Sequence, residues 1–193
     1  SELTYYLQIE LKKIGKKMLL CNSQDNYLSE IEYIEMAKQN KVYGIISVSY
    51  SNILPHLTEN LPYVAIERYY NESIHYVTSD NINGSKLAVN ELYKRECKNL
   101  LHITRKVENN KALMDRKFGF ETACKELNLN YSIFNCHCKS NEFRREVNKF
   151  IKESYNNNNK FDGIFCATDR YAQYVIDAFE EMQIKVPDDV QII

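Results

Sequence analysis

The feature that most constrains the fold of this 193-residue chain is an order of strand-like and helix-like segments that occurs twice. Residues 42–46 (VYGII) match residues 161–165 (FDGIF), and each follows a helical pattern and a polar connector. Later in each half a proline precedes an apolar strand, after Leu61 and after Val186. Proline can start a strand because the first residue need not donate to the ladder. Two matches in the same order predict two similar α/β halves.

Within each half, short apolar runs alternate with amphipathic helical patterns. The expected strands are residues 17–21, 44–48, 62–66 and 76–79 in the first half and 99–104, 131–135, 163–167 and 190–193 in the second. Strands that alternate with helices predict a parallel, doubly wound sheet, so the fold class is α/β with two Rossmann-like lobes. We expect residues 1–94 to form the N-terminal lobe and residues 95–193 the C-terminal lobe. The second half opens on a strand but the first opens on a helix, which indicates a fragment truncated at both ends.

Composition excludes several classes of protein. The formal net charge is −1, so no nucleic-acid surface is expected within this chain. No apolar run approaches the ~18 residues that a membrane span needs, and the N-terminus lacks a signal-peptide core. Six cysteines lie scattered, several inside apolar runs, which is typical of reduced thiols in a cytosolic protein. We therefore expect a cytoplasmic location and no membrane contact.

The motifs of enzyme chemistry are missing from the sequence. The five glycines never cluster into a GxGxxG or Walker loop, no GxSxG elbow occurs, and the four histidines show no HExxH spacing. Cys136, His137 and Cys138 form the one metal-like cluster, but no second Cys/His pair is spaced to complete four ligands. We expect no enzyme activity, no cofactor and no bound metal.

The strongest signal for a site lies in residues 76–93 (YVTSDNINGSKLAVNELY). This stretch predicts a strand, a polar turn at residues 80–83 and a helix from Gly84. Open α/β folds bind ligands where a strand delivers its carboxyl end to a helix N-terminus. Asp80, Asn81 and Asn83 lie at such a place, although these residues could simply cap the helix.

Polar residues also follow other predicted strands. The candidate set is Ser49, Arg68, Asp80, Asn83, Arg116, Thr168 and Asp169. If two lobes face each other, the carboxyl ends of both sheets border one cleft, and such side chains suit a polyhydroxylated ligand such as a sugar. Asp169 could instead cap the helix at residues 170–182. Arg116 could instead form an ion pair with Asp115 or Glu121.

Several segments together carry a resemblance to a known family. They are VTSDNINGSKLAVNEL (77–92), RKFGF (116–120) and FDGIFCATDRYAQYVIDAFEEMQIKVPDDVQII (161–193), with LLCNSQDN (19–26), VYGIISVS (42–49) and VAIERYY (64–70). In this set the chain resembles, over nearly its whole length, the effector-binding core of the LacI/GalR family of bacterial transcription regulators. The resemblance implies a type I periplasmic-binding-protein fold, a homodimer, a small effector in the interlobe cleft, and an upstream helix-turn-helix domain for operator DNA that is absent here.

The resemblance also assigns residues. It places the effector arginine at Arg116, the polar pair that opens the late helix at Thr168 and Asp169, the strand-to-helix acid region at Asp80 and Asn83, and the residue after the acidic strand end at Arg68. The sequence departs from the family at three places. Glu67 stands where Asp is usual, Ser85 replaces a second glycine, and residues 95–97 replace the usual Gly-His. The last change puts a local turn in doubt but not the fold.

Two functions from different classes fit these observations. The preferred one is the effector-sensing domain of a DNA-binding regulator, a repressor that binds a sugar or sugar phosphate and transmits occupancy to operator binding. The alternative is an extracellular solute-binding receptor of a sugar transporter, which shares the fold. The scattered cysteines and the missing signal peptide weigh against the alternative. The sequence upstream of Ser1 would separate the two.

Overall fold

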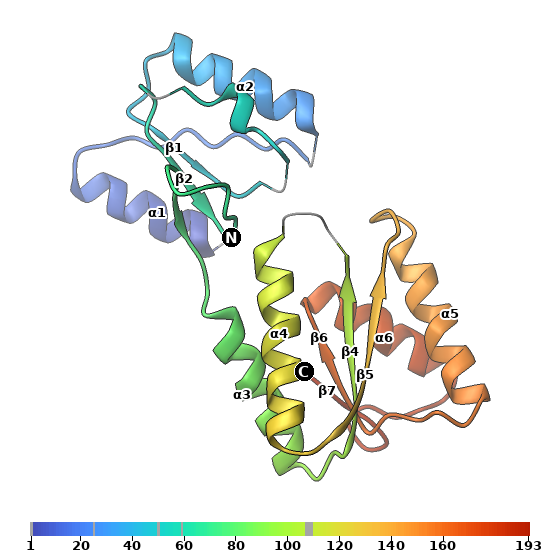
Figure 1. The fold of residues 1–193 in the computed structure, drawn as a ribbon. Helices are drawn as coiled ribbons and strands as arrows, with labels where there is room; N and C mark the ends of the chain where they lie inside the picture. The colour runs from blue at the N-terminus through green and yellow to red at the C-terminus, as the bar shows by residue number, and fades with distance from the viewer. Residues whose placement is uncertain (1, 25, 50, 59, 107–109) are drawn as a thin grey trace. The chain divides into compact units, whose positions relative to one another are not determined.

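A computed structural model of the chain describes residues 2–24, 26–49, 51–58, 60–106 and 110–193. Asp25, which belongs to the motif at residues 19–26, lies outside the described residues. The chain divides into two compact units, Ser1–Tyr63 and Val64–Ile193 (Figure 1). The lobe boundary near residue 94 stays a prediction.

The first unit is built mainly from two helices. Its elements are α1 (Glu2–Lys13), α2 (Tyr27–Gln39), β1 (Ile45–Ser47) and the short 3-10 helix η1 (Leu54–His56). Asn26 caps α2, because its side-chain oxygen accepts hydrogen bonds from the first free backbone N–H groups of the helix. Gly15 follows α1 with φ +69°, the left-handed conformation that commonly ends a helix.

One predicted strand is wrong. Residues 17–21 form no strand in the structure, and Leu19 and Leu20 are 72% and 68% exposed. A lone extended segment has no ladder partner for its backbone groups and no apolar face to bury. The apolar run KMLLC therefore stays outside the sheets.

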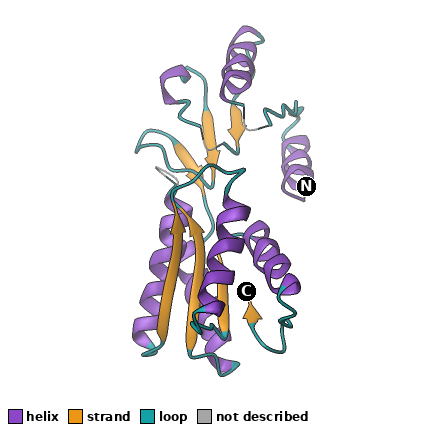
Figure 2. Ribbon diagram, turned by 90° about the vertical axis from the view of Figure 1, so that its right-hand side faces the viewer, coloured by secondary structure: helices purple, strands orange, loops and turns teal. Residues whose placement is uncertain are grey.

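Two parallel sheets are formed, and the α/β class is confirmed. The smaller sheet has the order β1-β2-β3, with β2 (Tyr63–Ile66) parallel to β3 (His75–Val77). The larger has the order β5-β4-β6-β7 and contains β4 (Asn99–Arg105), β5 (Asn130–Cys136), β6 (Gly163–Cys166) and β7 (Gln191–Ile192). All of its strands run in parallel (Figure 2). The matched motifs in β1 and β6 lie in different sheets, as predicted.

Helices cover both faces of the four-stranded sheet. They are α3 (Asn81–Lys94), α4 (Lys111–Glu126), α5 (Phe143–Asn156) and α6 (Asp169–Glu181). Leu101 and Ile103 of β4 pack with α5 and α6, whereas Leu100 packs with α3 and α4. Strand β4 is thus buried on both sides from Leu100 to Thr104. Each fully buried Leu or Ile contributes roughly 1.5–3 kcal/mol.

Helices α3 and α4 pack closely against each other. A Cβ atom at Gly119 would collide with the backbone oxygen of Ile82 and approach Cβ of Ser85 to 2.9 Å. The glycine is therefore needed for the close approach of the two backbones. Helix α3 begins at Asn81, three residues before the predicted start at Gly84.

No helix within the described part of the chain is both long and apolar enough to cross a membrane.

Candidate ligand-binding site

The carboxyl end of β6 leads directly into α6. Thr168 is the N-cap of this helix, and its hydroxyl oxygen accepts a hydrogen bond from the backbone N–H of Tyr171 at 3.4 Å. Asp169 is the first helical residue and is exposed. The capping role considered for Asp169 thus belongs to Thr168. Within the described residues the Asp169 carboxylate forms no hydrogen bond or ion pair, so it is accessible to a ligand.

Arg116, on α4, joins two other elements. Its Nε donates a hydrogen bond to Oδ1 of Asn81 at 2.7 Å, and its Nη1 donates to the backbone oxygen of Ala167. The ion pairs considered with Asp115 and Glu121 are not formed, and Asp115 instead binds Nζ of Lys111 at 2.8 Å. Arg116 therefore lies at the carboxyl end of β6 and beside the first residue of α3.

Glu67, the residue after β2, holds the connection between β3 and α3. Its carboxylate accepts hydrogen bonds from Oγ1 of Thr78 (3.0 Å), from the backbone N (2.7 Å) and Oγ (2.6 Å) of Ser79, and from Nδ2 of Asn81 (3.3 Å). Burial acts to raise the pKa of Glu67, but these hydrogen bonds outweigh it, and the pKa is lowered. The carboxylate is therefore ionised at neutral pH.

Asp80 and Asn83 form the turn that starts α3. Asp80 is the N-cap, and its Oδ1 accepts a hydrogen bond from the backbone N–H of Asn83 at 3.1 Å. Both side chains are exposed. The capping role is thus present in the structure, and it leaves the Asn83 side chain accessible. Since Asn81 contacts Arg116, this turn lies beside the Arg116 guanidinium.

Arg68 is a buried cation. It is 5% exposed, and its Nε and Nη1 atoms have no hydrogen-bond partner among the described residues. Its guanidinium lies 5.1 Å from the ring centroid of Tyr70. A cation–π contact contributes only about 0.5–2 kcal/mol, while burying an unpaired ion costs several kcal/mol.

Ser49, in the first unit, is 8% exposed. Its hydroxyl donates to Oε2 of Glu30 at 2.6 Å and accepts from the backbone N–H of Ser51 at 3.1 Å. Ser23 donates to the other Glu30 oxygen at 3.4 Å. Glu30 thus fixes the orientation of the Ser49 hydroxyl. No pattern in the sequence pointed to Glu30, because this residue lies within a helix and not at the end of a strand.

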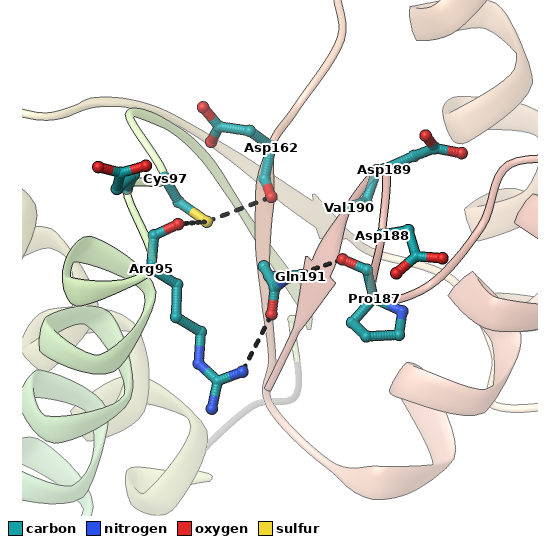
Figure 3. A pocket seen from close by; sticks show the side chains of 9 residues that line it. Arg95, Cys97, Asp162, Pro187, Asp188, Asp189, Val190 and Gln191 are labelled. Carbon is teal, nitrogen blue, oxygen red and sulfur yellow. Dashed lines mark hydrogen bonds between the residues drawn. The ribbon is translucent and has the colours of Figure 1, made fainter.

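The four-stranded sheet also borders a cavity of about 150 Å³ (Figure 3). It lies at the amino-terminal edge of the sheet, whereas Arg116 lies at the carboxyl end of β6. The cavity is lined by residues 95–97, Asp162 and residues 187–191. Asp162 accepts hydrogen bonds from the backbone N–H groups of Lys98 and Asn99. Gln191 links Arg95 to the backbone oxygen of Pro187 (Figure 3). The polar groups of this cavity thus bind each other and fasten the start of the sheet.

Cys136 and Cys138 are half-buried at the end of β5. Burial and a hydrogen bond with Cys138 raise the pKa of Cys136 to about 12, so its thiolate form is disfavoured. Across the described ranges, no three His, Cys, Asp or Glu side chains are arranged to hold a metal ion. That the protein binds no metal stays a prediction.

Comparison with known proteins identifies related sequences and structures. The family of periplasmic binding protein-like domains matches residues 89–193. The sucrose operon repressor of Streptococcus mutans is 33% identical over 100% of this chain and 58% of its own length. The ribose operon repressor of Halalkalibacterium halodurans is 29% identical over 93% of this chain and 53% of its own length. The chain thus spans a little over half the length of these relatives.

Among solved structures, a periplasmic binding protein/LacI transcriptional regulator from Alkaliphilus metalliredigens, in complex with D-xylulofuranose, has a TM-score of 0.78. It is 28% identical and covers 99% of this chain and 70% of its own. A putative ribose operon repressor from Burkholderia thailandensis has a TM-score of 0.84 at 21% identity, with 99% of this chain and 72% of its own covered, and supports the fold.

Proposed function

This chain belongs to the periplasmic binding protein-like family, as an effector-binding core of the LacI/GalR type. On that premise we propose that it senses a small sugar or sugar phosphate for a bacterial DNA-binding regulator. Relatives named as sucrose and ribose operon repressors support this role. So does the D-xylulofuranose bound to a structural relative. The protein is proposed to repress transcription, to catalyse no reaction, and to act in the cytoplasm as a homodimer.

The observation that carries the proposal is the polar end of β6. Arg116 is anchored there through Ala167, and the Asp169 carboxylate lies two residues further on, unpaired within the described residues. A guanidinium donates to hydroxyl or phosphate oxygens, and a carboxylate accepts from hydroxyl groups. The pair suits a ligand with several hydroxyls. Asp80, Asn83, Thr168, Arg68 and Ser49 are proposed to complete the site.

Ligand binding is proposed to act on DNA through a domain outside these 193 residues. A ligand shifts a conformational equilibrium only by its difference in affinity for the two states. The sugar is therefore proposed to favour one arrangement of the core that the DNA-binding part distinguishes.

A thermal-unfolding screen tests the proposal. The chain is heated with increasing concentrations of sucrose, D-ribose, D-xylulose and D-fructose 1-phosphate. A ligand that binds only the folded state at 100 times its Kd stabilises by about 2.7 kcal/mol, so one of these sugars should raise Tm in a concentration-dependent way. Mannitol at equal concentration controls for solvent effects. The absence of a Tm shift with any of these sugars, at concentrations up to about 50 mM, would count against the proposal.

A further inference from the structure

We propose that Asn81 is a positioning residue that orients the Arg116 guanidinium for the ligand. The inference rests on the proposed function, since it concerns the same site. Asn81 is only 6% exposed, so its proposed role is to act through Arg116 and not through direct contact with the ligand. Its hydrogen bond to Arg116 determines which N–H groups of the guanidinium remain for ligand oxygens.

The orientation of the Asn81 amide is fixed by its surroundings. Nδ2 donates to Oε2 of Glu67 (3.3 Å), Oγ1 of Thr78 (3.2 Å) and the backbone oxygen of Ser79 (3.0 Å). A rotated amide would bring its oxygen against these oxygen atoms, two of which, in Glu67 and Ser79, can only accept. Oδ1 must therefore point toward Nε of Arg116, which it accepts at 2.7 Å.

The backbone of Asn81 is fixed as well. Oγ of Ser85 donates to the backbone oxygen of Asn81 at 2.8 Å. One turn after Arg116, Gly119 packs against Ile82 with no room for a Cβ atom. The start of α3 is thereby held at a set distance from α4, and the short contact between Asn81 and Arg116 follows from this packing.

The remaining donors of Arg116 define how a ligand can bind. The guanidinium has five N–H donors. Nε is used by Asn81 and one Nη1 hydrogen by Ala167, and no described residue accepts from Nη2. Side-on binding through Nε is thus closed, and Nη2 with the second Nη1 hydrogen is left for a ligand. Nη2 therefore offers donors to ligand oxygens such as those of hydroxyl or phosphate groups.

The first test needs no ligand. Two-dimensional ¹H–¹⁵N spectra resolve the Nε–H signals of arginine side chains, and Arg116→Lys identifies the Arg116 signal by its loss. Asn81→Ala should shift and broaden this signal, because the guanidinium loses its fixed acceptor. Asn90→Ala on the exposed side of the same helix is the control and should leave the signal unchanged. An unchanged Arg116 signal in Asn81→Ala would overturn the inference, whether or not any sugar binds.

Asn81→Ser provides a second variant in case Asn81→Ala folds poorly. Serine is tolerated at helix starts, and its shorter side chain does not extend to Nε of Arg116. It should change the Arg116 signal in the same way as Asn81→Ala.

The second test measures binding of the same four sugars by calorimetry. Asn81→Ser should weaken binding of the sugar that stabilises the parent chain by about tenfold, which is the range of one charged hydrogen bond. In the Arg116→Ala background the same substitution should have little further effect, because there is no guanidinium to orient. Equal weakening in both backgrounds would overturn a positioning role. Failure of all sugars to bind would refute the proposed function, while the spectra would still decide the orientation of Arg116.

Discussion

At the scale of single residues, His102 has an unusual environment for a histidine. It is fully buried in β4 and forms a cluster of three rings with Phe120 (5.1 Å between ring centroids) and Phe165 (4.9 Å), which also stack on each other. Its Nδ1 donates to the backbone oxygen of Phe165 at 3.0 Å, and Nε2 has no partner within the described residues. Burial lowers the pKa of His102 to about 4. The positive charges of Lys117 and Arg116 act in the same direction, and the hydrogen bond to Phe165 opposes them. The imidazole is therefore neutral in the folded protein at neutral pH.

This pKa predicts a loss of stability in mild acid. The unfolded chain protonates His102 near pH 6.5, whereas the folded chain does so only near pH 4. The contribution of the neutral imidazole is thus complete above pH 6.5 and declines as the pH falls toward 4, by about 3 kcal/mol. Urea unfolding at pH 7, 5.5 and 4.5 measures this decline. It should be smaller in His102→Phe and unchanged in His137→Gln, whose histidine is exposed; the same decline in His102→Phe would exclude His102 as its source.

Arg116→Ala is predicted to weaken sugar binding at least tenfold, because the ligand oxygens would lose a charged donor and stay desolvated, which costs on the order of 2 kcal/mol. Calorimetry measures the affinity, and circular dichroism checks that the fold is retained. Arg144→Ala removes an exposed arginine paired with Asp177 and serves as the control. Unchanged affinity in Arg116→Ala would refute its assignment to the site.

At the scale of elements, the packing of α3 against α4 determines the geometry of the site. Gly119 permits the close approach, and Glu67 holds the turn that precedes α3. Glu67 has φ +56°, and in this conformation its carboxylate accepts a hydrogen bond from the backbone N–H of Ser79. The turn held by Glu67 and the helix packing at Gly119 thus both fix the position of the start of α3, where Asn81 contacts Arg116.

Two glycine substitutions are predicted to have opposite effects. Alanine in an open helix position is more stable than glycine by up to about 1 kcal/mol, and nothing lies within 4 Å of a Cβ atom at Gly84. Gly84→Ala should therefore raise the free energy of unfolding. Gly119→Ala should lower it by about 1–3 kcal/mol, because the added methyl group meets the backbone of Ile82. Urea unfolding of both variants checks this, and equal stabilisation would show that α3 and α4 can separate freely.

At the scale of the whole molecule, the two units differ in the size of their cores. Among the described residues of the first unit, the buried apolar ones are Ile34, Ala37, Ile53, Leu61 and Tyr63, and helix α1 has no buried residue. In the second unit, two buried clusters fill both faces of the four-stranded sheet. Because apolar burial is the main source of stability, the two units should differ in their resistance to local unfolding.

Hydrogen exchange of the isolated chain is predicted to reveal this difference. With the protein at micromolar concentration, amides in α1 and α2 should exchange faster than amides in β4 and β6. Mass spectrometry of peptides after timed exchange measures both sets in one sample. The frayed helix ends provide an internal reference for rapid exchange. Equal protection across the two units would contradict the prediction.

Most of the fold followed from sequence pattern. Alternating apolar strands and amphipathic helices predicted the parallel sheet, because period and burial are coupled along a single element. The same reasoning failed at residues 17–21, where an apolar run has no strand beside it. Polar residues after strands also placed Arg116 and Thr168 near one sheet edge, since parallel strands end together.

The contacts of these residues were decided by tertiary structure alone. Asn81 and Arg116 are 35 positions apart, and Ala167 lies another 51 from Arg116. The burial that lowers the pKa of His102, and the hydrogen bond from Ser49 to Glu30, likewise depend on which elements pack together. Sequence spacing encodes which face of an element is buried, because that depends on neighbours within a few residues. Hydrogen-bond partners and desolvation depend on distances across the fold, and only the packed chain sets those distances.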